Sequence, residues 1–319
     1  MTTHTPHALL TQFLLAKRAA GKSPRTIEWY REQLQTYLDW LPAHLDWDRL
    51  EAIVFCASSC ARRAEGKIEA YLAAQRDPAL ALSANTVAAR YRALKIWFGW
   101  LTQRKKLWPA SPMAESEKPH VPKVVVDYVK PAEFRRLYEA LGSDSWLDHR
   151  DRCIVLLLFW SGLRLGEVVG LNLGDVDTAA RLVTVRGGKG GKDRIVPCAP
   201  ELGPELLAYL MARPPWDGAE LFVSNDGAGG VRGVLTPNGL RQMLRRRCKQ
   251  AALRYMHPHA FRHGFAMAFL NAGMQMSAVS DAMGHSSEQV TASIYAHWLT
   301  EGLSQEYDQT RRRLLARMG

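Results

Sequence analysis

A stretch without helical periodicity, residues 108–129, divides this chain into two helical halves. It contains four prolines, at positions 109, 112, 119 and 122, among mixed charges. Proline lacks the backbone N–H that a helix interior needs, so repeated prolines favour an extended connection. The length of 319 residues is enough for two domains of ordinary size. We therefore predict one domain over residues 1–108, a linker over 109–129 and a second domain over 130–319.

The first half has the apolar spacing of helices. Ser23 and Pro24 form a helix start, and apolar residues then recur at helical intervals as far as Leu41. A second helix is predicted over residues 62–75. A third begins at Ser83, with an apolar stripe that runs from Val87 to Leu101.

The second half is predicted to be mostly helical with a small β insertion. Helices are expected near Pro131, Pro204, Pro237 and Pro258, over 151–160 and, after the Ser161–Gly162 break, over 163–171. The segments LVTVR and RIVPC have the residue types of strands, and the glycine-rich GGKGGKD between them predicts a hairpin with a mobile tip. The expected fold class is mainly α with a small β-hairpin or sheet.

The charge balance points to a polyanionic partner. The net charge is +11, and residues 1–118 and 119–319 carry +6 and +5 of it. A nucleic acid that contacts both halves would explain this distribution, whereas the alternative is a basic surface without a partner.

Several classes of protein are disfavoured. The longest strongly apolar run, Cys153–Trp160, is far shorter than the roughly 20 residues of a membrane-spanning helix. The start of the chain lacks the pattern of a secretory signal. Five scattered cysteines suit a reducing compartment, and Cys56 and Cys60 lack the partners of a metal site. We expect a cytoplasmic protein that associates with the nucleoid.

Two places in the second half carry polar residues that the local pattern does not require. Arg164 follows the glycine break, and Glu167 lies three residues later on the same helical face. They form either a structural ion pair or an arginine held by Glu167 and pointed at an anion. At the hairpin tip, Lys189 is either solvated or able to donate a proton in a site, and Lys192 is its rival for that role.

Two further places lie nearer the C-terminus. His259 and Arg262 are three residues apart, on one face near the start of a helix, which is a favourable position for a phosphate. His285 follows a glycine turn, and Tyr295 comes ten residues later. Taken alone, Tyr295 has the position of an ordinary core residue of an amphipathic segment.

Together, the order Arg, Lys, His-x-x-Arg, Gly-His, Tyr resembles the tyrosine recombinase, or phage integrase, family. The chain carries the segments SGLRLGE, GKGGKDRIVP, HAFRH and MGHSS. The layout is similar to Xer-like and mobile-element integrases over essentially the whole chain. The resemblance implies a helical, SAM-like core-binding domain followed by an α+β catalytic domain.

The resemblance also implies a chemistry. Tyr295 would attack a DNA phosphate to form a 3′-phosphotyrosyl link, and strand exchange would pass through a Holliday junction without metal, ATP or any cofactor. Arg164 and Arg262 would grip the phosphate, and Lys189 would protonate the leaving oxygen. His259 would assist deprotonation of Tyr295, and His285 would hydrogen-bond the phosphate. The spacing of ten residues between His285 and Tyr295 departs from the nine of many members.

The implied partners are double-stranded recombination sites and further copies of the chain in a tetramer, with accessory proteins possible and no membrane. Side chains selected as DNA contacts are Arg90, Lys95, Lys105 and Lys192, although the basic residues near 104–106 also suit a solvated helix end. The tail after Tyr295 is expected to dock on a neighbouring copy; the alternatives are that it packs on its own domain or is a solvated basic end. Two alternatives stay open: a type IB topoisomerase-like relaxing enzyme, and a non-catalytic DNA-binding protein.

Overall fold

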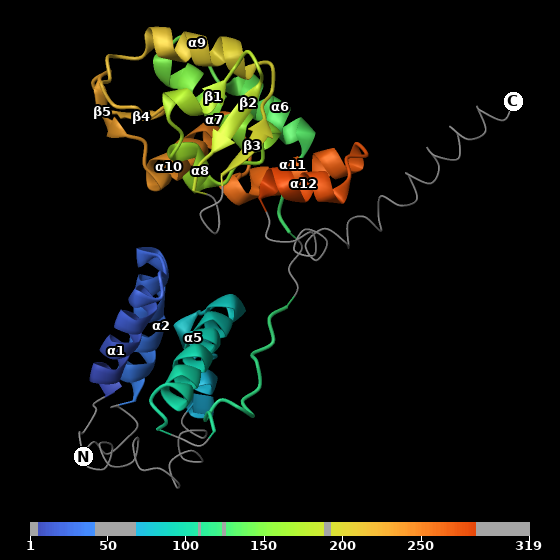
Figure 1. The fold of residues 1–319 in the computed structure, drawn as a ribbon. Helices are drawn as coiled ribbons and strands as arrows, with labels where there is room; N and C mark the ends of the chain where they lie inside the picture. The colour runs from blue at the N-terminus through green and yellow to red at the C-terminus, as the bar shows by residue number, and fades with distance from the viewer. Residues whose placement is uncertain (1–5, 42–67, 108–109, 123–125, 188–192, 285–319) are drawn as a thin grey trace, which may run out of the picture. The chain divides into compact units, whose positions relative to one another are not determined.

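The computed structural model describes residues 6–41, 68–107, 110–122, 126–187 and 193–284 (Figure 1). The chain divides into two compact units, Met1–Val124 and Val125–Gly319. Their boundary falls inside the segment predicted as a linker.

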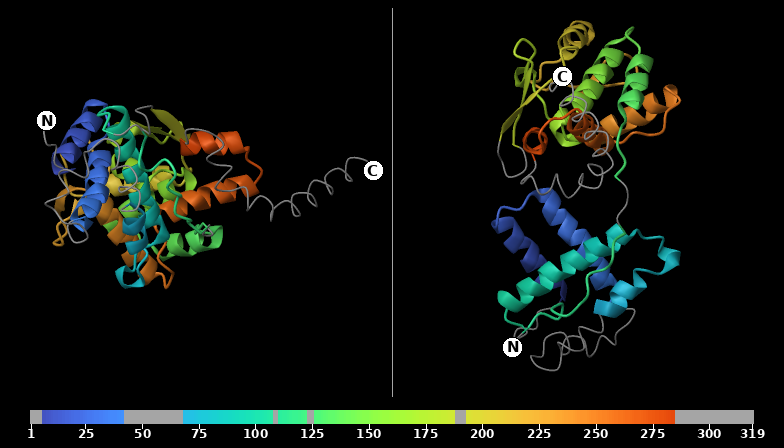
Figure 2. Two further views of the ribbon diagram at one scale, coloured as in Figure 1. Left: turned by 90° about the horizontal axis from the view of Figure 1, so that it is seen from below. Right: turned by 90° about the vertical axis from the view of Figure 1, so that its right-hand side faces the viewer.

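The N-terminal unit is helical. α1 (Pro6–Ala19) and α2 (Pro24–Trp40) pack side by side as a helical hairpin, and α5 (Ala84–Gln103) packs against α2 (Figure 2). Residues 68–74 are helical, and a short 3-10 helix, η2, spans Pro78–Leu80. The Oγ atoms of Ser23 and Ser83 accept backbone hydrogen bonds and cap α2 and α5, as the sequence predicted.

The segment predicted as a linker is shorter than expected. Met113 is fully buried in the core of the N-terminal unit, and the Tyr91 hydroxyl donates to the Ser116 carbonyl at 2.8 Å. At the other end, Val129 is buried in the C-terminal unit, where its N–H donates to the Ala260 carbonyl at 2.9 Å. Buried apolar side chains thus attach both ends of this segment to the units that they adjoin.

The C-terminal unit combines helices with two small antiparallel sheets. One sheet has the order β1 (Val176–Asp177), β2 (Leu182–Val185), β3 (Arg194–Pro197), and the other pairs β4 (Val223–Asn225) with β5 (Val231–Val234). In chain order the helices are α6 (Pro131–Ala140), α7 (Trp146–Trp160), α8 (Leu165–Val169), the 3-10 helix η3 (Leu173–Asp175), α9 (Leu202–Ala212), α10 (Pro237–Gln250), α11 (Pro258–Asn271) and α12 (Met276–Met283). This confirms the predicted mainly α fold with a β-hairpin.

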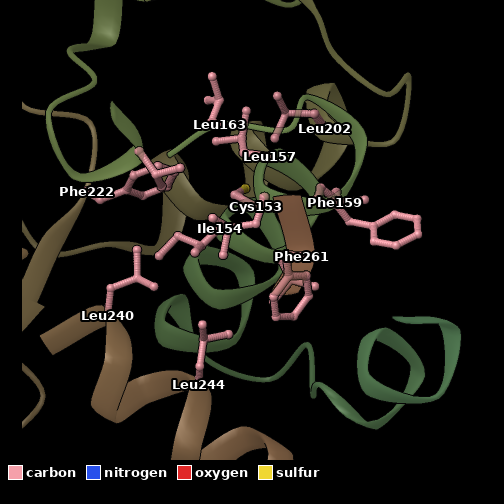
Figure 3. Packing of buried hydrophobic residues seen from close by; sticks show 14 of the residues in the cluster. Cys153, Ile154, Leu157, Phe159, Leu163, Leu202, Phe222, Leu240, Leu244 and Phe261 are labelled. Carbon is pink, nitrogen blue, oxygen red and sulfur yellow. The ribbon is translucent and has the colours of Figure 1, made fainter. Parts of the chain in front are cut away.

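The core of the C-terminal unit is built around α7. Its apolar run includes Cys153, Ile154 and Leu157, which are almost completely buried (Figure 3). α9 and α11 pack against this helix, and Phe261 brings α11 into the same core. Because α7 ends at Trp160, the core fixes the position of the Ser161–Arg164 turn that follows.

Some boundaries differ from the predictions. α7 begins at Trp146 rather than 151, because Ser145 and Asp148 form a reciprocal capping box. The predicted helix over 163–171 is limited to α8, and Arg164 is its N-cap residue. Among the described residues, the features that were not predicted are α1, α12, the strand β1, the β4–β5 pair and the 3-10 helices η2 and η3.

Candidate active site

Two hydrogen bonds join Arg164 and Glu167, in a site to which β3 and the end of α12 also contribute. The Arg164 Nη1 donates to Glu167 Oε1 at 2.8 Å, and the Arg164 backbone N–H donates to Oε2 at 2.7 Å. Arg164 Nη2 donates to the carbonyl of Gly284 at 2.9 Å. The predicted ion pair therefore exists, and it holds the guanidinium at the start of α8.

Arg194, which the sequence analysis did not select, is the second partner of Glu167. Its Nη1 and Nη2 donate to Oε1 and Oε2 of that carboxylate, each at 2.8 Å. Its Nε donates to the carbonyl of Ala282 at 3.1 Å. The arginine in GKGGKDRIVP was the available signal, but its partner lies 27 residues earlier in the chain.

The pKa of Glu167 reflects these contacts. Burial alone raises the pKa of the carboxyl, but hydrogen bonds from Arg194 and from the backbone and side chain of Arg164 outweigh burial and lower it to about 2. Glu167 is therefore a carboxylate throughout the physiological range, with its oxygens occupied by two arginines.

Replacing Glu167 with glutamine is expected to destabilise the protein by about 3 kcal/mol at neutral pH, because it leaves two arginines without their carboxylate. Since folding lowers the pKa of Glu167, its contribution is complete above the ordinary value of 4.5 and is lost as the pH falls towards about 2. Urea denaturation of wild type and Glu167→Gln at several pH values measures this. The difference in unfolding free energy should shrink below pH 4.5, and a constant difference would contradict the assignment.

Arg262 lies on α11, which is capped by the side chain of His257. The His257 Nδ1 accepts the backbone N–H of Ala260 at 3.1 Å, and Pro258 occupies the first turn. The Arg262 side chain is buried, its Nη1 donates to the Gly162 carbonyl at 2.7 Å, and its Nη2 donates to the Met283 carbonyl. The guanidinium thus bridges the turn before α8 and the end of α12.

Gly162 allows this arrangement through its backbone conformation. Its φ is +60°, and a Cβ placed there would lie 2.6 Å from Cδ1 of Phe265. Glycine adopts this φ without steric cost, and the absent side chain admits the ring from α11.

The substitution Gly162→Ala is expected to destabilise the protein by about 2 to 4 kcal/mol, because it combines left-handed backbone strain with a clash in a packed core. Thermal unfolding measures the effect. Gly166→Ala is the matched control, since a Cβ at that helical position meets nothing within 4 Å. We expect the control to change stability by no more than about 1 kcal/mol. Equal effects of the two substitutions would contradict the assigned role of Gly162.

His259 lies one turn before Arg262 and is exposed. Partial desolvation lowers the pKa of its imidazole, and the positive charges of His257, Arg262 and Arg164 lower it further. His259 is consequently neutral at physiological pH and able to accept a proton. The electrostatic effect of Arg164 and Arg262 on this side chain indicates that the three groups gather in one region.

The turn after α12 connects the two arginines. Arg262 contacts the Met283 carbonyl, Arg164 contacts the Gly284 carbonyl, and Gly284 has a φ of +61° that ends the helix. This turn immediately precedes His285 in the sequence.

Four predicted site residues lie outside the described residues: Lys189, Lys192, His285 and Tyr295. The predicted tail contacts and the pair Cys56 and Cys60 also lie outside them. The hairpin that carries the two lysines is described at its base, where the Gly187 N–H donates to the Asp193 carboxylate at 2.8 Å.

The DNA contacts selected on α5 and just after it have different surroundings. Lys95 is exposed, and its Nζ lies 5.7 Å from the centre of the Tyr91 ring. Lys105 is half-buried, with its Nζ 5.4 Å from the centre of a Trp100 ring. The Arg90 Nε is buried and has no hydrogen-bond acceptor in the described parts of the chain.

A basic groove was not predicted. It lies between the start of α2 and the second half of α5, and its lining includes Arg25, Trp29, Arg92 and Ile96. Both arginines are exposed. Two guanidinium groups beside an indole ring suit a phosphate backbone. The signal in the sequence was the S-P-R-T helix start, whose arginine could not be paired with α5 without the fold.

The described ranges hold neither a candidate metal cluster nor a helix that could cross a membrane. Over residues 6–41, 68–107, 110–122, 126–187 and 193–284, no group of three His, Cys, Asp or Glu side chains is placed to hold a metal ion. No helix in that part of the chain has the length and apolar character to cross a membrane.

Sequence comparison finds similarity along the whole chain. Residues 127–301 match the profile of the phage integrase family. The tyrosine recombinase XerA of Thermococcus kodakarensis is 29% identical over 309 residues, which is 96% of each chain. The tyrosine recombinase XerD of Ralstonia nicotianae is 30% identical over 293 residues, covering 89% of this chain and 87% of that protein.

Solved structures show the same fold. The crystal structure of a XerA recombinase has a TM-score of 0.51 and 28% identity, and it covers 95% of this chain and 98% of its own. A lambda integrase dimer bound to a COC′ core site has a TM-score of 0.67 and 16% identity, with 90% and 94% coverage. The second likeness concerns the fold alone.

Proposed function

The chain belongs to the phage integrase family of tyrosine recombinases, and from this premise we propose that it exchanges strands between two specific double-stranded DNA sites. Cleavage forms a 3′-phosphotyrosyl intermediate, exchange passes through a Holliday junction, and the working form is a tetramer in the cytoplasm. No ATP is required, because the covalent link conserves the energy of the phosphodiester bond. No metal ion is required, because the six proposed catalytic side chains take its place.

The observation that supports this proposal best is the convergence of Arg164 and Arg262 on one turn. Their guanidinium groups come from α8 and α11, yet they donate to the adjacent carbonyls of Gly284 and Met283. Two arginines fixed by backbone contacts form a preorganised clamp for the negative charge that develops on a phosphate under attack.

The proposed reaction assigns one task to each group. The Tyr295 hydroxyl oxygen attacks phosphorus, the bond to the 5′ oxygen breaks, and Arg164 and Arg262 stabilise the charge on the non-bridging oxygens. His259, neutral because of its lowered pKa, takes the phenolic proton. Lys189 gives a proton to the leaving 5′ oxygen, and His285 hydrogen-bonds the phosphate. These last two roles rest on the family resemblance.

Contacts to the DNA backbone are proposed for the groove of Arg25 and Arg92 in the N-terminal unit. Arg92→Ala should weaken binding of a duplex and reduce the slope of log affinity against log salt by about 1. Fluorescence anisotropy over a range of salt concentrations measures both quantities. Arg31→Ala is the control, because Arg31 is an exposed arginine of α2 that does not line the groove. Identical salt slopes for the two variants would contradict this assignment.

The proposed activity is tested by covalent capture. Wild-type protein is incubated in EDTA with nicked duplexes that carry a randomised core, and DNA that stays attached to protein in SDS is sequenced. The recovered sequences are then placed in pairs on a supercoiled plasmid. We expect recombinant plasmids whose formation depends on both sites.

Other outcomes identify the alternatives. Relaxed plasmids without recombinants would indicate a topoisomerase-like enzyme instead. DNA binding without any covalent adduct would contradict the catalytic proposal and favour a binding protein.

A further inference from the structure

Arg194 contacts the candidate site through three hydrogen bonds, but the proposed reaction gives it no role. We propose that Arg194 is a positioning residue for strand cleavage, which holds Glu167 in place so that Glu167 keeps the Arg164 guanidinium oriented for the phosphate. This inference rests on the proposed function. Arg194 lies at the start of β3, at the base of the hairpin that carries Lys189.

The hydrogen bonds of Glu167 support separate roles for the two arginines. Each oxygen of the carboxylate accepts from both arginines: Oε1 from the two Nη1 atoms, and Oε2 from Arg194 Nη2 and the Arg164 backbone. Arg164 contributes a single side-chain bond, whereas Arg194 contributes a bidentate pair. A bidentate pair fixes the plane of the carboxylate, which one bond does not. Glu167 therefore stays oriented even when the Arg164 guanidinium engages another anion.

Arg194 also contacts the turn that leads to His285. Its Nε donates to the Ala282 carbonyl, and a Cβ on Gly284 would lie 3.0 Å from its Cδ and Nε atoms. The guanidinium is thus placed between α8 and the end of α12, with 13% of its side chain exposed. One side chain therefore links three segments that carry or adjoin proposed catalytic groups: the hairpin, the Arg164 turn and the Gly284 turn.

The charge balance of this cluster supports the same role. In the described parts of the chain, Glu167 forms ion pairs with Arg164 at the start of its own helix and with Arg194 of β3. Backbone carbonyls at the end of α12 accept hydrogen bonds from both arginines. Burial of Glu167 favours its neutral form, and the hydrogen bond from the Arg194 side chain opposes this effect most strongly. Without Arg194, Glu167 would take up a proton at a higher pH and would no longer orient Arg164.

The test uses the full-length protein and a nicked duplex recovered by covalent capture. Arg194→Met, Arg194→Lys and the control Arg213→Met are compared with wild type. Arg213 is also a partly buried arginine, and it donates to the Leu221 carbonyl at 3.1 Å, outside this cluster. Three quantities are measured: the single-turnover rate of adduct formation from pH 5 to pH 8, the affinity for the duplex, and thermal stability.

We expect Arg194→Met to form the adduct about 10²-fold more slowly, because small misplacements of reacting groups typically slow a reaction by this factor. Its affinity for the duplex should change less than about threefold. Arg194→Lys keeps the charge but not the bidentate grip, so it should retain the wild-type pH profile at an intermediate rate. Arg213→Met should match wild type in rate and pH profile.

Several outcomes overturn the inference. A wild-type rate for Arg194→Lys would show that the bidentate grip is not needed, and this result holds even if Arg194→Met fails to fold. A rate of adduct formation for Arg194→Met within about threefold of the wild-type rate would reduce Arg194 to a structural contact. If wild-type protein itself forms no adduct, the proposed function fails first, and this inference fails with it.

Discussion

Replacing Tyr295 with phenylalanine is expected to lower covalent capture of DNA by at least about 10⁴-fold, because in the proposed mechanism the change removes the oxygen that forms the phosphotyrosyl bond. Affinity for the duplex should be unchanged, since a phenyl ring keeps the shape of the side chain. Adduct formation is measured on SDS gels, and affinity is measured by anisotropy on the same duplex.

The neighbouring tyrosines in the sequence provide the controls. Tyr255 and Tyr307 are the nearest tyrosines on either side of Tyr295. Tyr255→Phe and Tyr307→Phe should form the adduct at rates close to that of wild type. An adduct that survives in Tyr295→Phe and disappears in one of these two variants would assign the nucleophile to the tyrosine replaced in that variant. An adduct retained by all three variants would point to a different kind of nucleophile.

Sequence reasoning succeeded where structure is set by near neighbours. Ser23 and Ser83 were identified as helix starts because a cap bonds to an amide three residues later. The Arg164–Glu167 ion pair was predicted for the same reason, since residues three apart share a helical face. The β2–β3 hairpin was predicted from the residue types of its two strands and from the glycine-rich turn between them. Its register pairs Val183 with Val196.

Sequence reasoning failed where a partner lies far along the chain or where a local signal was overlooked. Arg194 resembles an ordinary charge at a strand end, and only the fold brings it to Glu167 and Ala282. The β4–β5 pair was missed although its turn has a local signature: Asp226 Oδ1 accepts the N–H groups of Ala228 and Gly230. Such aspartate and glycine turns join short strands that periodicity alone does not reveal.

The carbonyl contacts of the two arginines could not be predicted at all. Backbone oxygens have no residue-specific signature, so nothing in the sequence indicates that Gly162, Met283 and Gly284 would orient guanidinium groups. The glycines at two of these positions adopt positive φ, which is visible only in the structure. The arginines were selected from the pattern, but the means by which they are held came from the tertiary fold.

Replacing Arg262 with lysine is expected to slow adduct formation by about 10² to 10³-fold, the usual effect of removing one charge-stabilising donor from an active site. The guanidinium donates to the Gly162 and Met283 carbonyls through separate nitrogens, so its plane is fixed before substrate binds. A lysine ammonium is a single point charge and cannot contact both carbonyls and a phosphate in the same geometry. Affinity for the duplex should change little, because most of it comes from contacts to other phosphates.

Arg262→Lys should also cost about 1 to 3 kcal/mol of stability, because a buried carbonyl loses its donor. Arg150→Lys separates this effect from catalysis: Arg150 is equally buried, and its Nη1 donates to the Val223 carbonyl at 2.8 Å, away from the site. Both variants are assayed well below their melting temperatures. We expect both to be destabilised but only Arg262→Lys to lose cleavage. Equal losses of cleavage in the two variants would mean that Arg262 acts through stability, and the proposed phosphate clamp would then rest on Arg164 alone.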